Sequence, residues 1–267
     1  MDNGEILKKE EIFHDQWAES IVIDEVMVDE FFEACTAPEN RIILQNLGNL
    51  QGRSLLEIGC GAGEASVYFA KKGALVTATD ISNGMLHVVN LVARKHNVQV
   101  ATKQCFSGNL PFMDNSFDFV YAANILHHVN ITDTIIEIRR VLKAGGIFVC
   151  WEPLAHNPAI NVYRRIATEV RTTDEHPLKM SDIKKIRDSF RQVSAKGTWF
   201  FTLFIFIKYY FIDKIDPNKE RYWKKILTDH KKLEPIYSKL EKMDNFLLKY
   251  CPFLKRYCWN IVLYCKK

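Results

Sequence analysis

The sequence lacks the spacings that mark metal sites and disulfide frameworks. Its seven cysteines are scattered, none belongs to a C-x-x-C pair, and no histidine-rich tract accompanies them. An odd, dispersed set of this kind predicts reduced thiols and no zinc site. Long apolar runs are also missing: no stretch approaches the length of a membrane span, and the first residues, MDNGEILKKEE, contain no apolar signal core. These absences predict a cytoplasmic protein without a bound metal.

Neither sign of charge dominates the whole chain, but the charge is unevenly distributed. The formal net charge is +4, and the residues from Pro217 onward carry thirteen Lys and Arg against five Asp and Glu, which gives +8 there and −4 before it. A basic tail would favour an acidic surface. A solvated helical face explains the same pattern, and the sequence leaves both interpretations open.

What is present is a glycine-rich stretch behind an apolar run. In LLEIGCGAGEAS, residues 55–66, a buried strand is expected to lead into Gly59, Gly61 and Gly63. Glycines at this spacing allow a sharp turn and let the backbone lie against a ligand where a β-carbon would clash. The dinucleotide pattern G-x-G-x-x-G needs its third glycine where Glu64 stands, so the stretch argues against a nicotinamide cofactor.

A second apolar run, residues 75–80, ends in an acid about twenty residues past the first glycine, where it suits the two hydroxyls of a ribose. Together, E-x-G-x-G-x-G and V-x-A-x-D-I-S resemble the S-adenosylmethionine (SAM) site of class I methyltransferases. The resemblance implies SAM as the cofactor. It also implies that the cofactor is bound by Glu57, Gly59, Gly61, Gly63, Asp80 and Ile81.

Strands and helices alternate along the middle of the chain. The pattern predicts strands at 54–58, 75–80, 98–104, 117–122 and 146–151, with helices at 64–72, 83–96 and 133–142. Two more strands are expected at 190–201, broken by Gly197, and at 257–267. The resemblance implies a Rossmann-like, seven-stranded α/β sheet of the class I methyltransferase type, mostly parallel with an antiparallel last strand, and with helices on both faces.

We expect four segments with different roles. They are an N-terminal helical lid (1–50), a SAM-binding core (51–201), a helical cap insertion (202–256) and a final core strand (257–267). In class I enzymes the N-terminal helices often close over the cofactor, and this chain resembles them in position. For Trp17, within the lid, core packing and contact with the site are both open.

Two motifs after the third strand narrow the resemblance. L-P-F-x-D-x-S-F-D, residues 110–118, and N-x-L-H-H-V, residues 124–129, resemble the methyltransferase type 11 subgroup, which includes the ubiquinone and menaquinone methyltransferases. The resemblance implies that Ser107 passes beside the adenine and that Asn124 passes beside the methionine part of the cofactor. The acid that often binds the adenine amine in that family is missing here.

Candidate bases and acceptor residues follow the fourth and fifth strands. A neutral hydroxyl or an acidic C–H needs a base, and histidine suits proton removal near neutral pH, whereas a carboxylate acceptor needs none. The candidate bases are His127, His128 and His156. The polar segment 152–178 begins beside the cofactor, which predicts acceptor binding, with a solvated helix as the alternative. Its candidate residues are Tyr163, Arg164, Arg165 and His176.

The start of the cap insertion, TLFIFIKYYFI, is unusually apolar and aromatic. It is too short to span a bilayer. Three interpretations are open: a buried cap over the acceptor pocket, an oligomer contact, or a membrane-interface contact through residues 199–214 with Lys208 and Lys214 reaching towards headgroups.

The sequence therefore predicts a SAM-dependent methyltransferase acting on a small-molecule acceptor, with the oxygen of a natural-product, sugar or lipid-linked substrate favoured over nitrogen or carbon. Quinone-type carbon methylation at a membrane face is one alternative, and a non-catalytic SAM-binding protein is another. The N-P-P-Y and Pro-Cys motifs of nucleic-acid methyltransferases are absent after the fourth strand, so no nucleic-acid partner is expected. The oligomeric state stays open.

Overall fold

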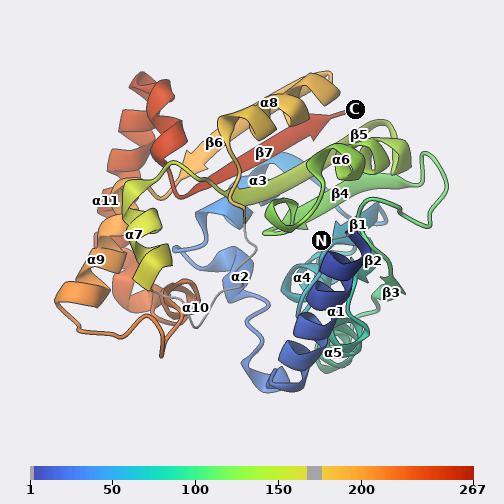
Figure 1. Ribbon diagram of the computed structural model, residues 1–267, viewed down its shortest axis with the longest axis horizontal. Helices are drawn as coiled ribbons and strands as arrows, with labels where there is room; N and C mark the ends of the chain where they lie inside the picture. Colours follow the sequence, from blue (N-terminus) through green and yellow to red (C-terminus); the bar gives the residue numbers. More distant parts are fainter. Residues whose placement is uncertain (1–2, 167–175) are drawn as a thin grey trace.

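The computed structural model describes residues 3–166 and 176–267 and contains one seven-stranded sheet with helices on both faces (Figure 1). Its strands are β1 (Ser54–Ile58), β2 (Leu75–Asp80), β3 (Ala101–Gln104), β4 (Phe117–Ala123), β5 (Leu142–Pro153), β6 (Gln192–Thr198) and β7 (Asn260–Lys266). They are ordered β3-β2-β1-β4-β5-β7-β6. β1 to β5 pair in parallel, whereas β7 is antiparallel to both of its neighbours. The predicted mixed sheet is therefore confirmed.

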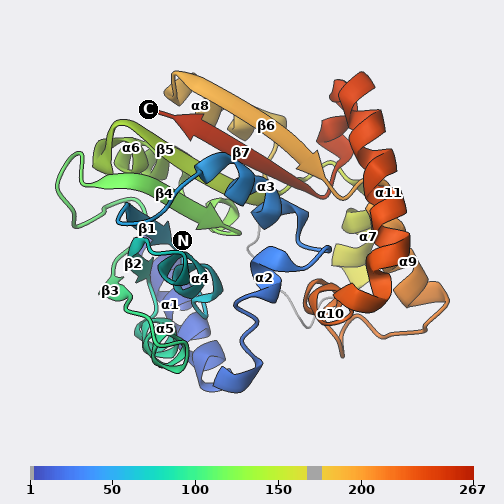
Figure 2. The same ribbon diagram turned by 180° about the vertical axis from the view of Figure 1, so that it is seen from behind.

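Helices lie against the sheet and also gather at one side of it. The N-terminal and sheet-covering helices are α1 (Asn3–Glu19), α2 (Glu30–Glu33), α3 (Pro38–Leu47), α4 (Glu64–Lys71), α5 (Asn83–Lys95), α6 (Ile131–Val141) and α8 (Met180–Ser189). The helices that gather at one side of the sheet are seen in Figures 1 and 2. They are α7 (Pro158–Ile166), α9 (Phe204–Phe211), α10 (Tyr222–Thr228) and α11 (His230–Tyr250). The 3-10 helices are η1 (Ile23–Glu25), η2 (Leu126–His128), η3 (Phe201–Leu203) and η4 (Pro252–Tyr257).

The central strands are apolar at successive positions because helices cover both faces of the sheet. In β1, Leu55 and Leu56 are both fully buried. Successive side chains of a strand point to opposite faces, and these two leucines belong to different core clusters. A strand buried on both faces gives a continuous apolar run in the sequence. This explains why the predicted bounds of β1 and β2 agree with the structure.

Several predicted strands differ from the observed ones at their ends: β5 begins at Leu142 instead of residue 146, and β6 and β7 are shorter than the predicted 190–201 and 257–267. β3 begins at Ala101 rather than at residue 98, because Asn97 turns the chain with a φ of 55° and the Val98 N–H still donates to the end of α5. The prediction that Gly197 breaks the sixth strand is wrong. Gly197 pairs with Ile261 inside β6, and a β-carbon there would lie 2.6 Å from the sulfur of Cys258, so glycine provides space rather than a break.

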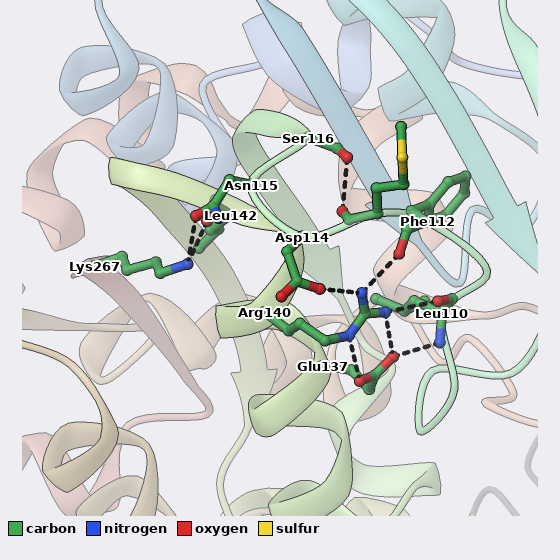
Figure 3. A network of polar contacts seen from close by, with 10 residues as sticks. Leu110, Phe112, Asp114, Asn115, Ser116, Glu137, Arg140, Leu142 and Lys267 are labelled. Carbon is green, nitrogen blue, oxygen red and sulfur yellow. Dashed lines mark hydrogen bonds and ion pairs between the residues drawn. The ribbon is translucent and has the colours of Figure 1, made fainter.

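The L-P-F-x-D-x-S-F-D motif forms a loop that α6 holds in place (Figure 3). The Arg140 guanidinium donates to the carbonyl oxygens of Leu110 at 2.8 Å and Phe112 at 2.7 Å. It also pairs with the Asp114 carboxylate at 2.9 Å. Glu137 binds the same guanidinium and accepts a hydrogen bond from the Leu110 N–H at 2.7 Å. Arg140 and Glu137 of α6, together with Asp114 of the motif, therefore hold the loop that precedes β4.

The insertion between β6 and β7 packs around its own aromatic core. Tyr163 of α7 lies against Phe206 and Tyr222, with ring centroids 5.7 Å and 5.2 Å away. Asp244 of α11 joins this unit to the end of β6, because its buried carboxylate accepts hydrogen bonds from the N–H groups of residues 200–202. We call this unit, α7 with α9 to α11, the cap.

Helix α9 is apolar on both its inner and its outer side. Ile205, Phe206 and Tyr209 are buried in the cap, whereas Phe211 and Ile212 are 71% and 72% exposed. Across residues 3–166 and 176–267, no helix combines the length and the apolarity needed to cross a bilayer. The inner side of α9 is thus part of the cap core, and the outer side presents large apolar groups to solvent.

Candidate functional site

The glycine loop between β1 and α4 contains three residues in the left-handed region. The φ angles of Gly59, Gly61 and Gly63 are 66°, 48° and 88°. A β-carbon at Gly59 would lie 2.8 Å from Ile125, and one at Gly63 would lie 2.9 Å from Val89. A β-carbon at Gly61 would meet nothing within 4 Å. The outer two glycines therefore permit close packing, and the middle one borders open space in which a ligand can lie.

Asp80, at the end of β2, is hydrogen-bonded to the middle of this loop. Its buried carboxylate accepts from the N–H of Gly61 at 3.1 Å and from the N–H of Ser82 at 3.0 Å. Burial raises the pKa of this carboxyl above its ordinary value. The next residue, Ile81, is half-buried, and its carbonyl oxygen accepts from Gln104 Nε2 at 2.8 Å. The fold thus brings together the glycines and the acid that the sequence motif contains.

Three carboxyl groups lie around the glycine loop. Burial raises the pKa of Glu57 to about 8, and the nearby carboxyls of Glu64 and Asp80 add to the shift. Ser66 Oγ donates a hydrogen bond to Glu57, and this bond acts in the opposite direction by lowering the pKa of Glu57. Burial also raises the pKa of Glu64. Crowded, poorly solvated acids favour a positively charged ligand and disfavour a phosphate.

A buried histidine–carboxylate pair lies where β4 and β5 end side by side. His127 Nδ1 is 2.7 Å from a Glu152 oxygen, and the two side chains are 6% and 0% exposed. The other oxygen of Glu152 accepts hydrogen bonds from the N–H groups of Ile125 at 2.9 Å and Leu126 at 2.8 Å. Glu152 therefore fixes the turn η2, and His127 is held inside the protein by its pairing with Glu152.

His128 faces the N-terminal helix α1. Its Nδ1 lies 3.8 Å from the carboxylate of Glu10, and another oxygen of that carboxylate is 3.4 Å from His14 Nε2. The hydrogen bond with His14 and the nearby charges of His128 and His127 lower the pKa of Glu10. A carboxylate at one imidazole nitrogen orients the ring so that the other nitrogen can accept a proton. Glu10 lies within ion-pair distance of His128 but beyond hydrogen-bond distance, so it can stabilise a charge on this ring without fixing the ring's orientation.

Three further predicted residues occupy separate places near the strand ends. His156 is half-buried in the turn before α7. Asn124 is exposed after β4, with a left-handed φ of 55°, and its N–H donates to the Trp151 carbonyl oxygen at 3.1 Å. Ser107 is buried, with its Oγ 2.9 Å from Thr134 Oγ1. Asn124 is therefore open to a ligand, whereas the Ser107 hydroxyl already pairs with α6.

Within the described part of the chain, the predicted acceptor residues do not form one cluster. Tyr163 packs in the aromatic core of the cap. The Arg164 guanidinium donates to oxygens on and just before α7. Arg165 is exposed on α7, and His176 is exposed in the chain leading to α8. The part of the predicted segment at residues 167–175, which includes Glu175, lies outside the described residues.

Helix α1 docks beside the site through contacts that the sequence analysis missed. Asp15 accepts hydrogen bonds from Ser82 Oγ at 2.5 Å and from the Gly84 N–H at 3.0 Å, at the start of α5. Both bonds lower the pKa of Asp15, and the bond from Ser82 has the larger effect. A β-carbon at Gly84 would lie 3.0 Å from Ala18, so α1 and α5 cross closely, as both views show (Figures 1 and 2). α1 therefore borders the site next to Asp80.

The far end of α1 meets the cap. The Arg221 guanidinium carbon lies 5.1 Å from the centroid of the Trp17 ring. Lys224, one turn further along α10, pairs with Glu25 at 3.3 Å. Arg221 was missed in the sequence because it stands alone in a polar linker, with no motif around it. Trp17 is half-buried against the core and also contacts the cap.

A family match covers the part of the chain that holds the loop and the histidines. Residues 56–150 match the family described as Methyltransferase domain. The match begins in β1 and ends in β5, so it includes the glycine loop, Asp80 and the turn with His127 and His128. For these residues, the methyltransferase domain predicted from the motifs is confirmed.

Curated relatives match the chain in part. A sterol 24-C-methyltransferase of Gibberella zeae is 33% identical over 140 residues, which are 51% of this chain and 37% of that protein. A ubiquinone biosynthesis O-methyltransferase of Alkalilimnicola ehrlichii is 33% identical over 129 residues, 48% of this chain and 52% of that protein. The chain thus spans about half or less of the length of these relatives.

A solved structure shares the fold. Phosphoethanolamine N-methyltransferase 2 of Haemonchus contortus, in complex with phosphomonomethylethanolamine and S-adenosylhomocysteine, aligns with a TM-score of 0.56. The alignment covers 86% of this chain and 52% of that chain, at 21% identity. At this identity the likeness concerns the fold.

Proposed function

We propose that this chain, which carries a methyltransferase domain over residues 56–150, binds SAM at its glycine loop and transfers the methyl group to a small-molecule acceptor. The observation that carries the proposal is the hydrogen bond from the Gly61 N–H to the Asp80 carboxylate, beside the open space over Gly61. It supports a site in which the ribose meets Asp80 while the rest of the cofactor lies along the glycines.

The acidic surroundings of the loop support the same cofactor. SAM carries a sulfonium and an ammonium and has no phosphate, whereas dinucleotides are anions. A cation bound beside Glu57, Glu64 and Asp80 would favour the ionised forms of these acids, whereas a pyrophosphate would raise their pKa values further and bind poorly. In this proposal the cofactor extends from the end of β2 towards the turn after β4. Ile81 lies beside its ribose, Ser107 beside its adenine and Asn124 beside its methionine part.

We assign the removal of the acceptor proton to His128. SAM supplies the activated methyl group, so the protein must align the acceptor and hold a base. Glu10 lies close enough to His128 to stabilise the imidazolium that forms when His128 takes the acceptor proton as the methyl group is transferred. His127 is committed to Glu152 and positions the turn, and His156 is the second candidate base. The relative named as an O-methyltransferase supports oxygen as the acceptor atom.

Carbon methylation at a membrane face is the second candidate function. It is favoured by the outer side of α9, where Phe211 and Ile212 are exposed, and by the relative named as a sterol 24-C-methyltransferase. The charge of +8 from Pro217 onward complements an anionic lipid surface. In this candidate function α9 rests on such a surface and the cap receives the acceptor there.

Calorimetric titration with SAM and with S-adenosylhomocysteine tests the cofactor. Asp80→Ala should raise both dissociation constants about tenfold to a hundredfold, because a hydrogen bond to a charged group contributes about 1.5–3 kcal/mol. Asp188→Ala, at an exposed position of α8, is the matched control and should leave both constants unchanged. Absence of binding to the unaltered protein would refute the proposal.

Transfer of a labelled methyl group to a panel of phenols, sugars, hydroquinones and sterols tests the reaction. Binding of SAM without transfer to any acceptor would favour the non-catalytic alternative. Co-sedimentation with vesicles of phosphatidylcholine and phosphatidylserine tests the membrane contact. Phe211→Ser and Ile212→Ser should release the protein, whereas Met113→Ser, which is 82% exposed on the loop before β4, should not. Equal binding by all three variants would refute the contact.

A further inference from the structure

Arg221 is a half-buried guanidinium with no carboxylate partner among residues 3–166 and 176–267. It lies over the face of Trp17. Burial lowers its pKa from the ordinary value. A guanidinium carries five N–H donors, and a ring face satisfies none of them as a hydrogen-bond acceptor would. A partly desolvated charge of this kind is costly unless a counter-charge arrives.

The position of Arg221 is fixed by its neighbours on α10. Tyr222 is buried in the cap, and its hydroxyl donates to the Ile215 carbonyl oxygen at 2.6 Å. Arg221 is directed instead towards α1. Glu25, an acid in the 3-10 helix η1 that follows α1, pairs with Lys224 and not with Arg221. Within the described parts of the chain, the fold therefore leaves Arg221 without an internal anion although Lys224, one turn away, has one.

Arg221 and the candidate base lie at two ends of the same face of α1. Glu10, His14 and Trp17 are spaced i, i+4 and i+7, so their side chains share one side of the helix. Glu10 faces His128 at one end, and Trp17 faces Arg221 at the other. Seven residues of α-helix rise about 10 Å. His128 and Arg221 therefore contact positions of α1 that are about two turns apart.

Aromatic side chains lie in the region between the sheet and the cap. Phe31 of α2 and Trp151 of β5 have ring centroids 6.4 Å apart. Both views show α2 between α10 and α4 (Figures 1 and 2). These two half-buried rings offer apolar surface to an acceptor that reaches from the sheet to the cap.

We propose that Arg221 binds an oxyanion of the acceptor, a phosphate or a carboxylate, at the cap end of α1, while the atom that receives the methyl group lies towards His128 at the other end. The planar guanidinium offers two parallel N–H donors to such a group, which a lysine cannot do. Trp17 holds the plane of the guanidinium in place. The acceptor is thus a small amphipathic anion. This inference rests on the proposed function, since it takes the methyl transfer to occur beside His128.

Binding of matched anionic and neutral probes tests the inference. The full chain, saturated with S-adenosylhomocysteine, is titrated with phenyl phosphate, benzoate and phenol. We expect at least one anion to bind about tenfold or more tightly than phenol, as charge-assisted hydrogen bonds allow. Arg221→Gln should remove this preference, and Arg221→Lys should retain part of it. Arg191→Gln, at an exposed position beside β6 and remote from α1, should behave as the unaltered protein.

The outcomes distinguish oxyanion binding by Arg221 from a purely structural role of this residue. Equal affinity for anions and phenol, or a preference that survives in Arg221→Gln, overturns the inference. If Arg221 only latches α1 to the cap, Arg221→Gln weakens S-adenosylhomocysteine binding but leaves the ratio of anion to phenol affinity unchanged, which also overturns it. Failure of the unaltered protein to bind S-adenosylhomocysteine refutes the proposed function instead.

Lipid and free anions are distinguished by vesicles of phosphatidylcholine with and without phosphatidic acid. Binding that requires phosphatidic acid and is lost in Arg221→Gln supports a lipid phosphate as the source of the oxyanion. Binding of phenyl phosphate or benzoate without any binding of vesicles supports a free acceptor. If Arg221→Gln binds both the vesicles and the free anions as the unaltered protein does, the inference is overturned.

Discussion

The carboxylate of Glu10 lies 3.8 Å from Nδ1 of His128, although one residue is on the N-terminal helix and the other is in the turn after β4. The contact places an acid from outside the matched methyltransferase domain against a histidine inside it. An imidazolium that forms as a proton is removed is stabilised by a nearby carboxylate. In the proposed function, the N-terminal helix therefore contributes to the chemistry as well as bordering the site.

Glu10→Gln should lower the rate of methyl transfer without weakening cofactor binding. The substitution keeps the size of the side chain but removes the charge beside His128, so kcat should fall roughly tenfold or more. The measurements are kcat for an oxygen acceptor and the dissociation constant of S-adenosylhomocysteine. Glu19→Gln, at the exposed end of the same helix, is the control. An unchanged kcat in Glu10→Gln would show that His128 acts without this carboxylate or does not act at all.

Gly61→Ala should impair the cofactor site more than the fold. An alanine at a φ of 48° costs about 1–2 kcal/mol of backbone strain. The added methyl group has room in the free protein but would overlap a cofactor lying on the loop. The dissociation constant of S-adenosylhomocysteine should therefore rise about tenfold to a hundredfold, since overpacking by one methyl group costs about 1–3 kcal/mol.

Gly145→Ala is the matched control for that substitution. Gly145 also has a positive φ, 73°, and open space around its α-carbon, but it lies at the opposite end of the sheet. Urea unfolding should show similar losses of stability for both variants, while calorimetry should show weakened cofactor binding in Gly61→Ala alone. Equal binding by the two variants would place the cofactor elsewhere.

The stability of the protein should depend on pH through Glu57. The pKa of Glu57 in the folded protein is about 8, above the ordinary value of 4.5. Between these two pH values Glu57 therefore keeps its proton in the folded chain but has lost it in the unfolded chain. The free energy of unfolding should therefore fall as pH rises between these values, by at most about 1.4 kcal/mol per pH unit. Below the ordinary pKa of 4.5, this contribution of Glu57 to stability is fully present.

Glu57→Gln removes the titrating group and retains an acceptor for Ser66. The difference in free energy of unfolding between the two proteins, measured by urea titration from about pH 5 to about pH 9, isolates the contribution of Glu57. The unaltered protein should lose stability relative to the variant as pH increases. Two parallel curves would mean that the Glu57 carboxyl is ionised throughout.

Glu152→Gln should destabilise the turn that carries the histidines. The fully buried carboxylate binds two N–H groups with one oxygen and His127 with the other. An amide presents only one oxygen and must place its NH₂ group against one of these partners, which should cost about 3 kcal/mol. Thermal unfolding measures the loss. Glu137→Gln alters a carboxylate that holds the loop before β4 and does not contact His127 or His128, so it should lower stability with little effect on methyl transfer.

The sequence determines the parts of this fold that depend on local patterns. The bounds of β1 and β2 follow from continuous apolar runs, and the position of the cofactor loop follows from Gly59, Gly61 and Gly63. Ser82 begins α5 by accepting a hydrogen bond from the Met85 N–H at 3.0 Å, and serine is a residue type that favours this position. Periodicity, glycine spacing and capping act over a few residues, so they can be recognised without knowing the fold.

Contacts between distant segments could not be predicted in this way. Asp15 meets the start of α5, and Arg221 meets Trp17, only because whole helices are packed together. Nothing in the residues around either one marks it. The same is true of Glu152, which looked like part of an acceptor-binding segment and instead anchors a turn from the neighbouring strand. Pairings of this kind depend on tertiary structure rather than on any local pattern.

The place of β7 in the sheet has a consequence for how the chain is made. β7 lies between β5 and β6, yet residues 199–259, most of the cap, precede it in the chain. On a ribosome, β5 and β6 are complete well before the strand that joins them emerges. During that interval two sheet edges are open to pairing with other nascent chains. The speed with which the cap is synthesised and folds therefore decides how long the newborn protein is exposed to aggregation.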